Sequence, residues 1–163
     1  MSNIFLVFTG LLFAIFASCS GKEVYSRFHH LEGGKWCRDS VLVFTMDSLG
    51  YSSGTECMVT VELTTNRRYP YRDLWLIIDQ NLTDSLVCTD TLRLLLADEH
   101  GKLLGGGVGG LNQLSLPYRS FIPTPRDSMH QYRLAIRHGM DEELLRGVEK
   151  VGIKIVGEGG KGR

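Results

Sequence analysis

The sequence predicts an all-β domain, a single antiparallel β-sandwich that is jelly-roll-like and follows an N-terminal export signal. Apolar and polar residues alternate with a period of two in several segments, and turn-forming residues separate these segments. Helical periodicity is almost absent, so we expect at most one short helix. These observations together favour two antiparallel sheets that pack face to face over one core.

The predicted strands follow one another along the chain and cover residues 41–44, 58–64, 74–78, 91–97, 131–138 and 151–155. The segment 74–78 is apolar throughout, which is typical of a strand covered on both faces, and we therefore expect Trp75 in the core. Residues 140–145 are predicted to form one or two helical turns. Asp141 and Glu142 suit a helix N-terminus, and Gly147 suits the end of the helix.

The first residues carry an export and lipidation signal. An uncharged apolar run from Ile4 to Phe16 is followed by Ala17, Ser18 and Cys19. The run has the length of a secretory signal and is too short for a transmembrane helix, which needs about 20 residues. Small residues directly before a cysteine indicate a bacterial lipoprotein, in which Cys19 receives a diacylglycerol and then an acyl chain such as palmitate. The alternative is an ordinary secretory signal, or an uncleaved anchor, with an unmodified cysteine.

These features divide the chain into a signal peptide (1–18), a lipidated tether (19–24), one sandwich domain (25–156) and a disordered tail (157–163). The chain has 18 basic and 18 acidic residues, which gives a formal net charge of zero. This balance argues against a nucleic-acid partner and against a polybasic membrane patch. The membrane is therefore expected as a partner only through the lipid on Cys19.

No set of residues indicates catalysis, a metal site or a bound cofactor, so we expect a protein that is not an enzyme. A literal G-x-S-x-G at residues 50–54 precedes a strand instead of opening a helix, and is interpreted as a hairpin loop. A G-x-G-x-x-G within residues 105–110 is followed by no helical pattern, and is interpreted as a loop in which glycine permits close backbone approach. The only expected prosthetic group is the covalent lipid.

The cysteines after the signal leave two possibilities open. Cys37, Cys57 and Cys88 lie at spacings that match no zinc motif and identify no particular pair. One disulfide in an oxidising periplasm and small buried hydrophobic side chains are both compatible with the sequence.

A triplet of Asp, then Ser or Thr, then an aliphatic residue or Met occurs five times. Turn chemistry at strand starts accounts for such triplets. The alternative is O-glycosylation, because the triplet resembles the acceptor motif of Bacteroidota-type bacteria, and an acceptor must then face solvent. The possible acceptors are Ser40, Ser48, Ser85, Thr91 and Ser128.

Residues 67–72 form an aromatic and basic corner. Pro70 removes a backbone donor, so this segment cannot lie inside a central strand. Tyr69 and Tyr71 flank the proline, and Arg72 is one of three arginines beside them. Tyrosine and arginine are enriched at binding hot spots, so Tyr69, Tyr71 and Arg72 are candidate contact residues. The alternative is a structural corner whose tyrosines cover the edge of the core.

Three stretches of the sequence, 67–76, 96–107 and 132–153, resemble the gliding motility-associated lipoprotein GldH family in order and spacing. Asp73 departs from the family pattern, in which Asn is expected, and Leu103 and Leu104 stand where an aromatic residue is common. The resemblance implies a non-catalytic outer-membrane lipoprotein that supports surface gliding, a function linked to type IX secretion. For the mechanism we expect scaffolding, in which the lipid holds the domain at the membrane while an exposed face docks another component of the cell envelope.

Two further expectations concern location and ligand. The stretch after Cys19 is poor in acidic residues and does not resemble a surface-export signal, so we expect the domain to face the periplasm. The alternative function is a lipid-anchored glycan-binding module. The aromatic rings available for a glycan are those of Trp36, Tyr51, Tyr69, Tyr71 and Trp75.

Overall fold

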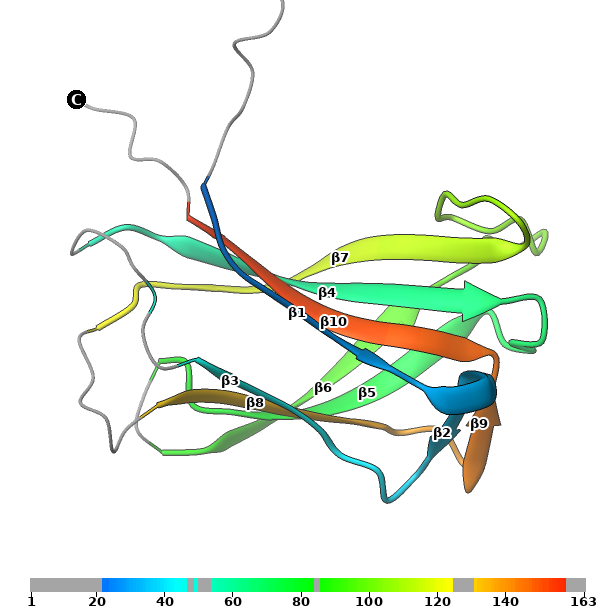
Figure 1. Cartoon of the computed structure of the whole chain (residues 1–163), viewed down its shortest axis with the longest axis horizontal. Coiled ribbons are helices and arrows are strands. Elements are labelled where there is room, and N and C mark those ends of the chain that lie inside the picture. The colour runs from blue at the N-terminus through cyan, green and yellow to red at the C-terminus, as the bar shows by residue number, and fades with distance from the viewer. Residues whose placement is uncertain (1–21, 47–48, 50–53, 84–85, 125–130, 158–163) are drawn as a thin grey trace, which may run out of the picture.

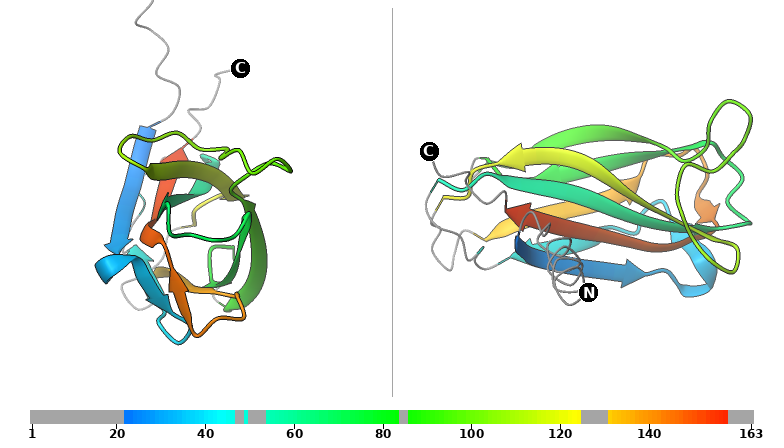
Figure 2. Two further views of the ribbon diagram at one scale, coloured as in Figure 1. Left: turned by 90° about the vertical axis from the view of Figure 1, so that its right-hand side faces the viewer. Right: turned by 90° about the horizontal axis from the view of Figure 1, so that it is seen from above.

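The computed structural model describes residues 22–46, 49, 54–83, 86–124 and 131–157. Two four-stranded antiparallel sheets lie face to face (Figures 1 and 2). The strand order of the first sheet is β1 (Lys22–His30), β10 (Val148–Gly157), β4 (Cys57–Asn66) and β7 (Leu111–Phe121). The order of the second is β3 (Leu42–Met46), β8 (Tyr132–His138), β5 (Asp73–Gln80) and β6 (Cys88–Leu95). This is the strand order of a jelly roll, so the predicted all-β sandwich is confirmed.

A two-stranded ribbon covers one end of the sandwich and corrects the prediction of a helix at residues 140–145. β9 (Leu144–Arg146) pairs with β2 (Lys35–Cys37), and Trp36 lies opposite Leu145. Both side chains are fully buried, which an extended strand achieves by turning alternate residues inward. The one helix in the described part of the chain is the 3-10 turn η2 (Glu32–Gly34), which is too short to cross a membrane.

The core follows the period of two that the sequence shows. Leu74, Leu76 and Ile78 of β5 point inward and are buried, whereas Trp75 is 40% exposed on the outer face. The expectation that Trp75 is a core residue was therefore wrong. The second sheet packs against the first with one face only. Alternate residues of the apolar run 74–78 therefore face away from the core, and Trp75 is one of them. There the guanidinium of Arg93 lies 5.6 Å from the centre of the Trp75 ring.

Trp36 and His138 fill the core beneath the ribbon. The indole Nε1 of Trp36 donates a hydrogen bond to the carbonyl of Ser40 at 3.0 Å, and the Trp36 and His138 rings meet edge to face at 5.4 Å. His138 Nε2 lies 3.2 Å from the carbonyl of Trp36, and His138 Nδ1 has no partner in the described part of the chain. Burial lowers the pKa of His138, which favours the neutral form of this packed imidazole.

The glycine-rich segment after β6 packs closely against the start of β7. Gly106 and Gln113 bridge the segment to the strand through two backbone hydrogen bonds. A Cβ atom on Gly107 would overlap the carbonyl oxygen of Leu111. Glycine is therefore needed for close approach, as the loop interpretation predicts. Residues 50–53 of the other glycine motif lie outside the described residues.

The two ends of the sandwich differ in their relation to the chain termini. We call the end that holds Lys22, Gly157, Cys57 and Phe121 the N-terminal end, since these residues pair across the first sheet. The opposite end, where β4 finishes at Asn66, carries η2 and the β2–β9 ribbon, and we call it the corner end (Figure 1). The ten residues of β4 separate the two ends by about 30 Å at a rise of about 3.3 Å per residue.

The predicted division into signal, tether, domain and tail stays a prediction. Residues 1–21 and 158–163 lie outside the described residues, and Cys19 is among them. The first described strand begins at Lys22.

Candidate functional site

The aromatic and basic corner connects β4 to β5 at the corner end of the sandwich. Asn66, the last residue of β4, shapes the turn. Its side-chain oxygen accepts a hydrogen bond from the backbone N–H of Arg68 at 2.7 Å, and its carbonyl accepts one from the N–H of Tyr69 at 3.1 Å. The side-chain amide of Asn66 also donates to the carboxylate of Glu149 on β10. These contacts fix the direction in which the corner leaves the sheet.

The backbone of the corner packs directly against Gly147. It lies between β9 and β10 with a φ of +87°, and its N–H donates to the carbonyl of Gly34 at 2.7 Å. The carbonyl of Gly147 accepts a hydrogen bond from the N–H of Asn66 at 2.8 Å. A Cβ atom at this position would overlap the backbone nitrogen of Tyr69. The corner therefore depends on direct backbone-to-backbone contact with a glycine.

Tyr69 is half-buried and is largely committed to the structure. Its hydroxyl donates a hydrogen bond to the carbonyl of Asp73 at 2.6 Å, and its ring packs against the hydrophobic core. Burial raises the pKa of the Tyr69 hydroxyl, and the nearby negative charge of Asp73 adds to this effect. The ring meets that of Tyr71 edge to face, with centroids 5.8 Å apart. The Tyr69 ring thus lies between the core and Tyr71 and holds the Tyr71 ring in place by this edge-to-face contact.

Tyr71 and Arg72 present the polar surface of the corner. The Tyr71 hydroxyl donates a hydrogen bond to the carboxylate of Glu142, and this bond raises the pKa of the Tyr71 hydroxyl. The backbone carbonyl of Arg72 accepts hydrogen bonds from the N–H groups of Leu96 and Ala97 at 2.7 and 3.1 Å. Its side chain is exposed, and its guanidinium makes no hydrogen bond or ion pair with any residue that the structure describes. Arg72 is therefore held by its backbone while its charge is free to meet a partner.

Trp75, which the sequence interpretation placed in the core, extends this surface together with Arg93 and Leu95, which it missed. Trp75 pairs with Arg93 across β5 and β6, and the neighbouring pair places Leu95 opposite Asp73. Leu95 is 42% exposed, and Arg93 Nε lies 2.7 Å from the carboxylate of Asp73. Alternation along the strand places Trp75 on the face opposite Leu74 and Leu76, but the sequence does not show whether that face is covered.

Other predicted residues are placed as follows. Ser40 and Thr91 are exposed, as an O-glycosylation acceptor requires, whereas Ser48, Ser85 and Ser128 lie outside the described residues, as does Cys19. Cys37 and Cys88 are exposed thiols at opposite ends of the sandwich, and Cys57 is buried.

The rings considered for glycan binding do not form one platform. Trp36 is fully buried, and Tyr51 lies outside the described residues. A cavity of about 550 Å³ opens beside the ribbon, lined by Cys37, Arg38, Asp39, Glu143 and Leu144. Its lining is polar and lacks an exposed aromatic ring. Within the described ranges, no group of three or more His, Cys, Asp or Glu side chains is arranged to hold a metal ion.

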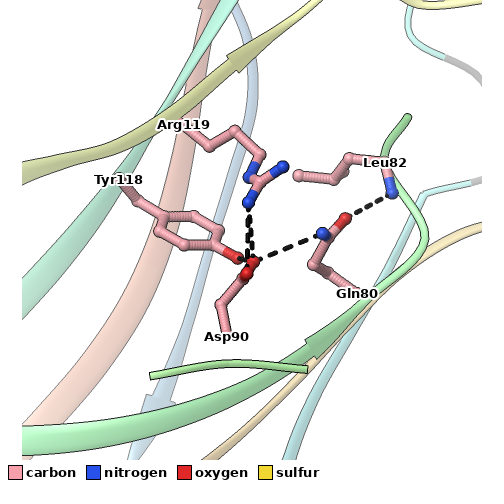
Figure 3. Close-up of polar contacts among 5 residues, drawn as sticks. All are labelled: Gln80, Leu82, Asp90, Tyr118 and Arg119. Atoms are coloured by element: carbon pink, nitrogen blue, oxygen red, sulfur yellow. Dashed lines mark hydrogen bonds and ion pairs between the residues drawn. The ribbon is translucent and has the colours of Figure 1, made fainter. Parts of the chain in front are cut away.

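A second polar cluster joins the two sheets where their edge strands β6 and β7 approach each other (Figure 3). The carboxylate of Asp90 accepts a hydrogen bond from the Tyr118 hydroxyl and lies 3.0 Å from Arg119 Nη2. It also accepts a hydrogen bond from Gln80 Nε2 at 3.3 Å. The side-chain oxygen of Gln80 in turn accepts one from the N–H of Leu82 at 2.7 Å.

A bulge in β7 makes this cluster possible. Val59 pairs with Arg119 and Thr60 with Pro117, so Tyr118 is the extra residue. A bulge redirects side chains, and consecutive residues can then reach the same carboxylate. Burial raises the pKa of the Tyr118 hydroxyl, and its bond to Asp90 adds to the shift. The groups satisfy one another and include no activated nucleophile, so we interpret the cluster as a structural bridge between the sheets.

Comparison with known proteins identifies relatives over almost the whole chain. The family model described as GldH lipoprotein matches residues 23–155. Gliding motility lipoprotein GldH of Flavobacterium johnsoniae is 28% identical over 161 residues, covering 94% of this chain and 94% of that protein. The gliding motility lipoprotein GldH homolog of Christiangramia forsetii is 26% identical over 163 residues, covering 95% and 97%. Dimeric latent PorU from Porphyromonas gingivalis aligns with a TM-score of 0.35 at 13% identity, covering 88% of this chain and 13% of that one, and supports no argument.

Proposed function

Because the chain belongs to the GldH lipoprotein family, we propose that it is a lipid-anchored, non-catalytic docking protein of the gliding motility and type IX secretion machinery. In this proposal Cys19 carries the lipid and the sandwich binds another envelope protein. The names of both relatives, gliding motility lipoproteins, support the gliding assignment. The link to type IX secretion rests on the family resemblance alone.

The observation that carries the docking proposal is the position of Tyr71 and Arg72. They lie at the corner end, about 30 Å from the end at which β1 begins, and Cys19 is only three residues before Lys22. The lipid therefore holds one end of the sandwich, while the other end presents Tyr71 and Arg72, whose guanidinium makes no ion pair with any described residue. Tyrosine and arginine bind well because they combine large contact area with directional hydrogen bonds.

We place the domain on the periplasmic face of the outer membrane. The stretch after Cys19, from Ser20 to Glu23, contains one acidic residue, and we take this low acidic content as support for retention on the periplasmic side. We expect the folded domain to resist protease added to intact cells and to be cleaved only after the outer membrane is permeabilised. Cleavage in intact cells would contradict the periplasmic placement.

The docking proposal is tested by cross-linking the tagged, lipidated protein in native membranes and identifying what it captures. The variant carries Tyr71→Ala and Arg72→Glu, while Tyr69 is retained because its ring and hydroxyl support the fold. We expect the variant to lose a specific envelope protein that the wild type captures, because it removes the partly exposed Tyr71 ring and reverses the charge at position 72.

The matched control changes an aromatic and arginine pair on β1, an edge strand of the first sheet. Phe28 is 41% exposed on β1 and Arg27 beside it is exposed, so Arg27→Ala with Phe28→Ala removes a similar surface away from the corner. Capture retained by the control and lost by the corner variant supports the proposal. Equal capture by all three proteins contradicts it. Saturable quenching of Trp75 fluorescence by a soluble envelope glycan, without protein capture, would favour the glycan-binding alternative.

A further inference from the structure

We infer that the N-terminal end of the sandwich rests on the lipid bilayer, with Leu86, Val87 and Ile122 as its contact residues. The inference rests on the lipid anchor at Cys19 that the proposed function includes. It adds a second, non-covalent membrane contact and therefore a defined orientation of the domain, with the corner end directed away from the membrane.

The length of the tether supports this orientation. Cys19 precedes the first residue of β1 by three residues, which span about 10 Å when fully extended. The sheet that runs from β1 to β7 contains four strands, so at a spacing of about 4.8 Å it is about 14 Å wide. Because the tether is short compared with the length of β4, about 30 Å for its ten residues, the start of β1 stays close to the membrane that holds the lipid and the corner end can lie farther away.

Exposed aliphatic side chains lie at the end that the tether holds. Leu86 is 72% exposed, Val87 is 63% exposed and Ile122 is 57% exposed. Val87 directly precedes β6, and Ile122 directly follows Phe121, which pairs with Cys57 at the N-terminal end. The two sites come from different sheets but lie on neighbouring edge strands, which the Asp90–Arg119 contact brings together (Figure 3).

The chemistry of these side chains matches the boundary between lipid headgroups and acyl chains. Single exposed aliphatic residues are common in proteins, but here three of them occupy the end nearest the anchor. Apolar side chains enter this boundary to a depth of about 5–10 Å, and such contacts add to a covalent lipid. The chain has a net charge of zero, so an apolar contact, and not attraction to anionic lipid, is the way this domain reaches the surface.

Two native cysteines allow the orientation to be measured. Cys88 is exposed next to Val87, whereas Cys37 is exposed on the ribbon at the corner end, and Cys57 is buried. The lipidated full-length protein is labelled with an environment-sensitive fluorophore on Cys88 in a Cys37→Ser background, or on Cys37 in a Cys88→Ser background. It is then placed on phosphatidylethanolamine–phosphatidylglycerol vesicles whose acyl chains carry bromine. We expect the bromine to quench the Cys88 fluorophore several-fold more than the Cys37 fluorophore.

Substitution then tests the contact residues. Leu86→Asp, Val87→Asp and Ile122→Asp together are expected to bring quenching at Cys88 down to the Cys37 level. Val108→Asp is the matched control, since Val108 is 89% exposed in the glycine-rich loop at the corner end, and it should leave quenching unchanged.

The outcomes separate this inference from the anchor itself. Wild-type protein that floats with the vesicles but shows equal quenching at both cysteines would overturn the orientation and leave the anchor intact. Quenching at Cys88 that survives the triple substitution would overturn the role of the three side chains. Wild-type protein that does not float with the vesicles would overturn both the anchor and the inference built on it.

Discussion

Gly147→Ala is expected to destabilise the protein by about 2–4 kcal/mol, more than a typical surface substitution. Two effects add. A φ of +87° is unfavourable for any residue with a Cβ atom and costs about 1–3 kcal/mol. The new methyl group would also overlap the backbone of Tyr69, which cannot move without breaking the hydrogen bonds that Asn66 makes to the corner. Urea unfolding should show the midpoint falling by about 1–2 M for a domain of this size.

Gly101→Ala separates the two effects. Gly101 has a φ of +78°, and a Cβ atom there would meet no described atom within 4 Å. This control therefore has the unfavourable positive φ of an alanine but no steric overlap of its methyl group. We expect it to destabilise the protein by about 1 kcal/mol. Equal losses for the two variants would show that contact between Gly147 and the corner does not contribute to stability.

Asp90→Ala is expected to destabilise the protein by about 2 kcal/mol. The substitution removes the shared acceptor of Tyr118, Arg119 and Gln80, and these donors are then left without a partner between the sheets. The Asp90 and Arg119 side chains are 27% and 36% exposed, so the cost should lie between that of a surface pair and that of a buried pair. Urea unfolding measures the loss.

Two comparisons make this prediction specific. Glu23 and Lys154 form an ion pair at 3.2 Å with side chains 51% and 39% exposed, so Glu23→Ala should cost no more than about 0.5 kcal/mol. In a double-mutant cycle of Asp90→Ala with Arg119→Met, we expect a coupling energy of about 1–2 kcal/mol. A coupling energy near zero would mean that the cluster does not bridge the edge strands energetically.

The sequence predicted the architecture because the determinants of that architecture are local. Alternation in β4, β8 and β10 places Val61, Leu134 and Ile153 inward, and this pattern specifies an extended strand with one buried face without knowledge of its neighbours. Pro70 likewise marks a break between two strands through its own covalent structure. The family resemblance and the lipidation signal also depend on the order of residues along the chain, and the family assignment is confirmed.

The two wrong predictions concern properties that depend on distant residues. Residues 144–146 have the composition of a short helix end, but β2 offers hydrogen bonds and Trp36 offers a packing surface, so they form a strand. Trp75 lies in an apolar run that would suit a strand covered on both sides. Which face of a sheet is covered is decided by the number of layers in the fold, and a run of five residues contains no record of that number.

The all-β class, the family and the aromatic and basic corner could be predicted from the sequence, because periodicity, proline and motif order are properties of neighbouring residues. Three relations emerge only when the sheets are packed: Tyr69 supports the fold while Arg72 is exposed, Asp90 contacts Tyr118 and Arg119, and Leu86 and Ile122 lie at one end of the sandwich. These relations arise from strand register and from the packing of two sheets. Register is set by the sum of many contacts between segments far apart in the chain, and no single segment specifies it.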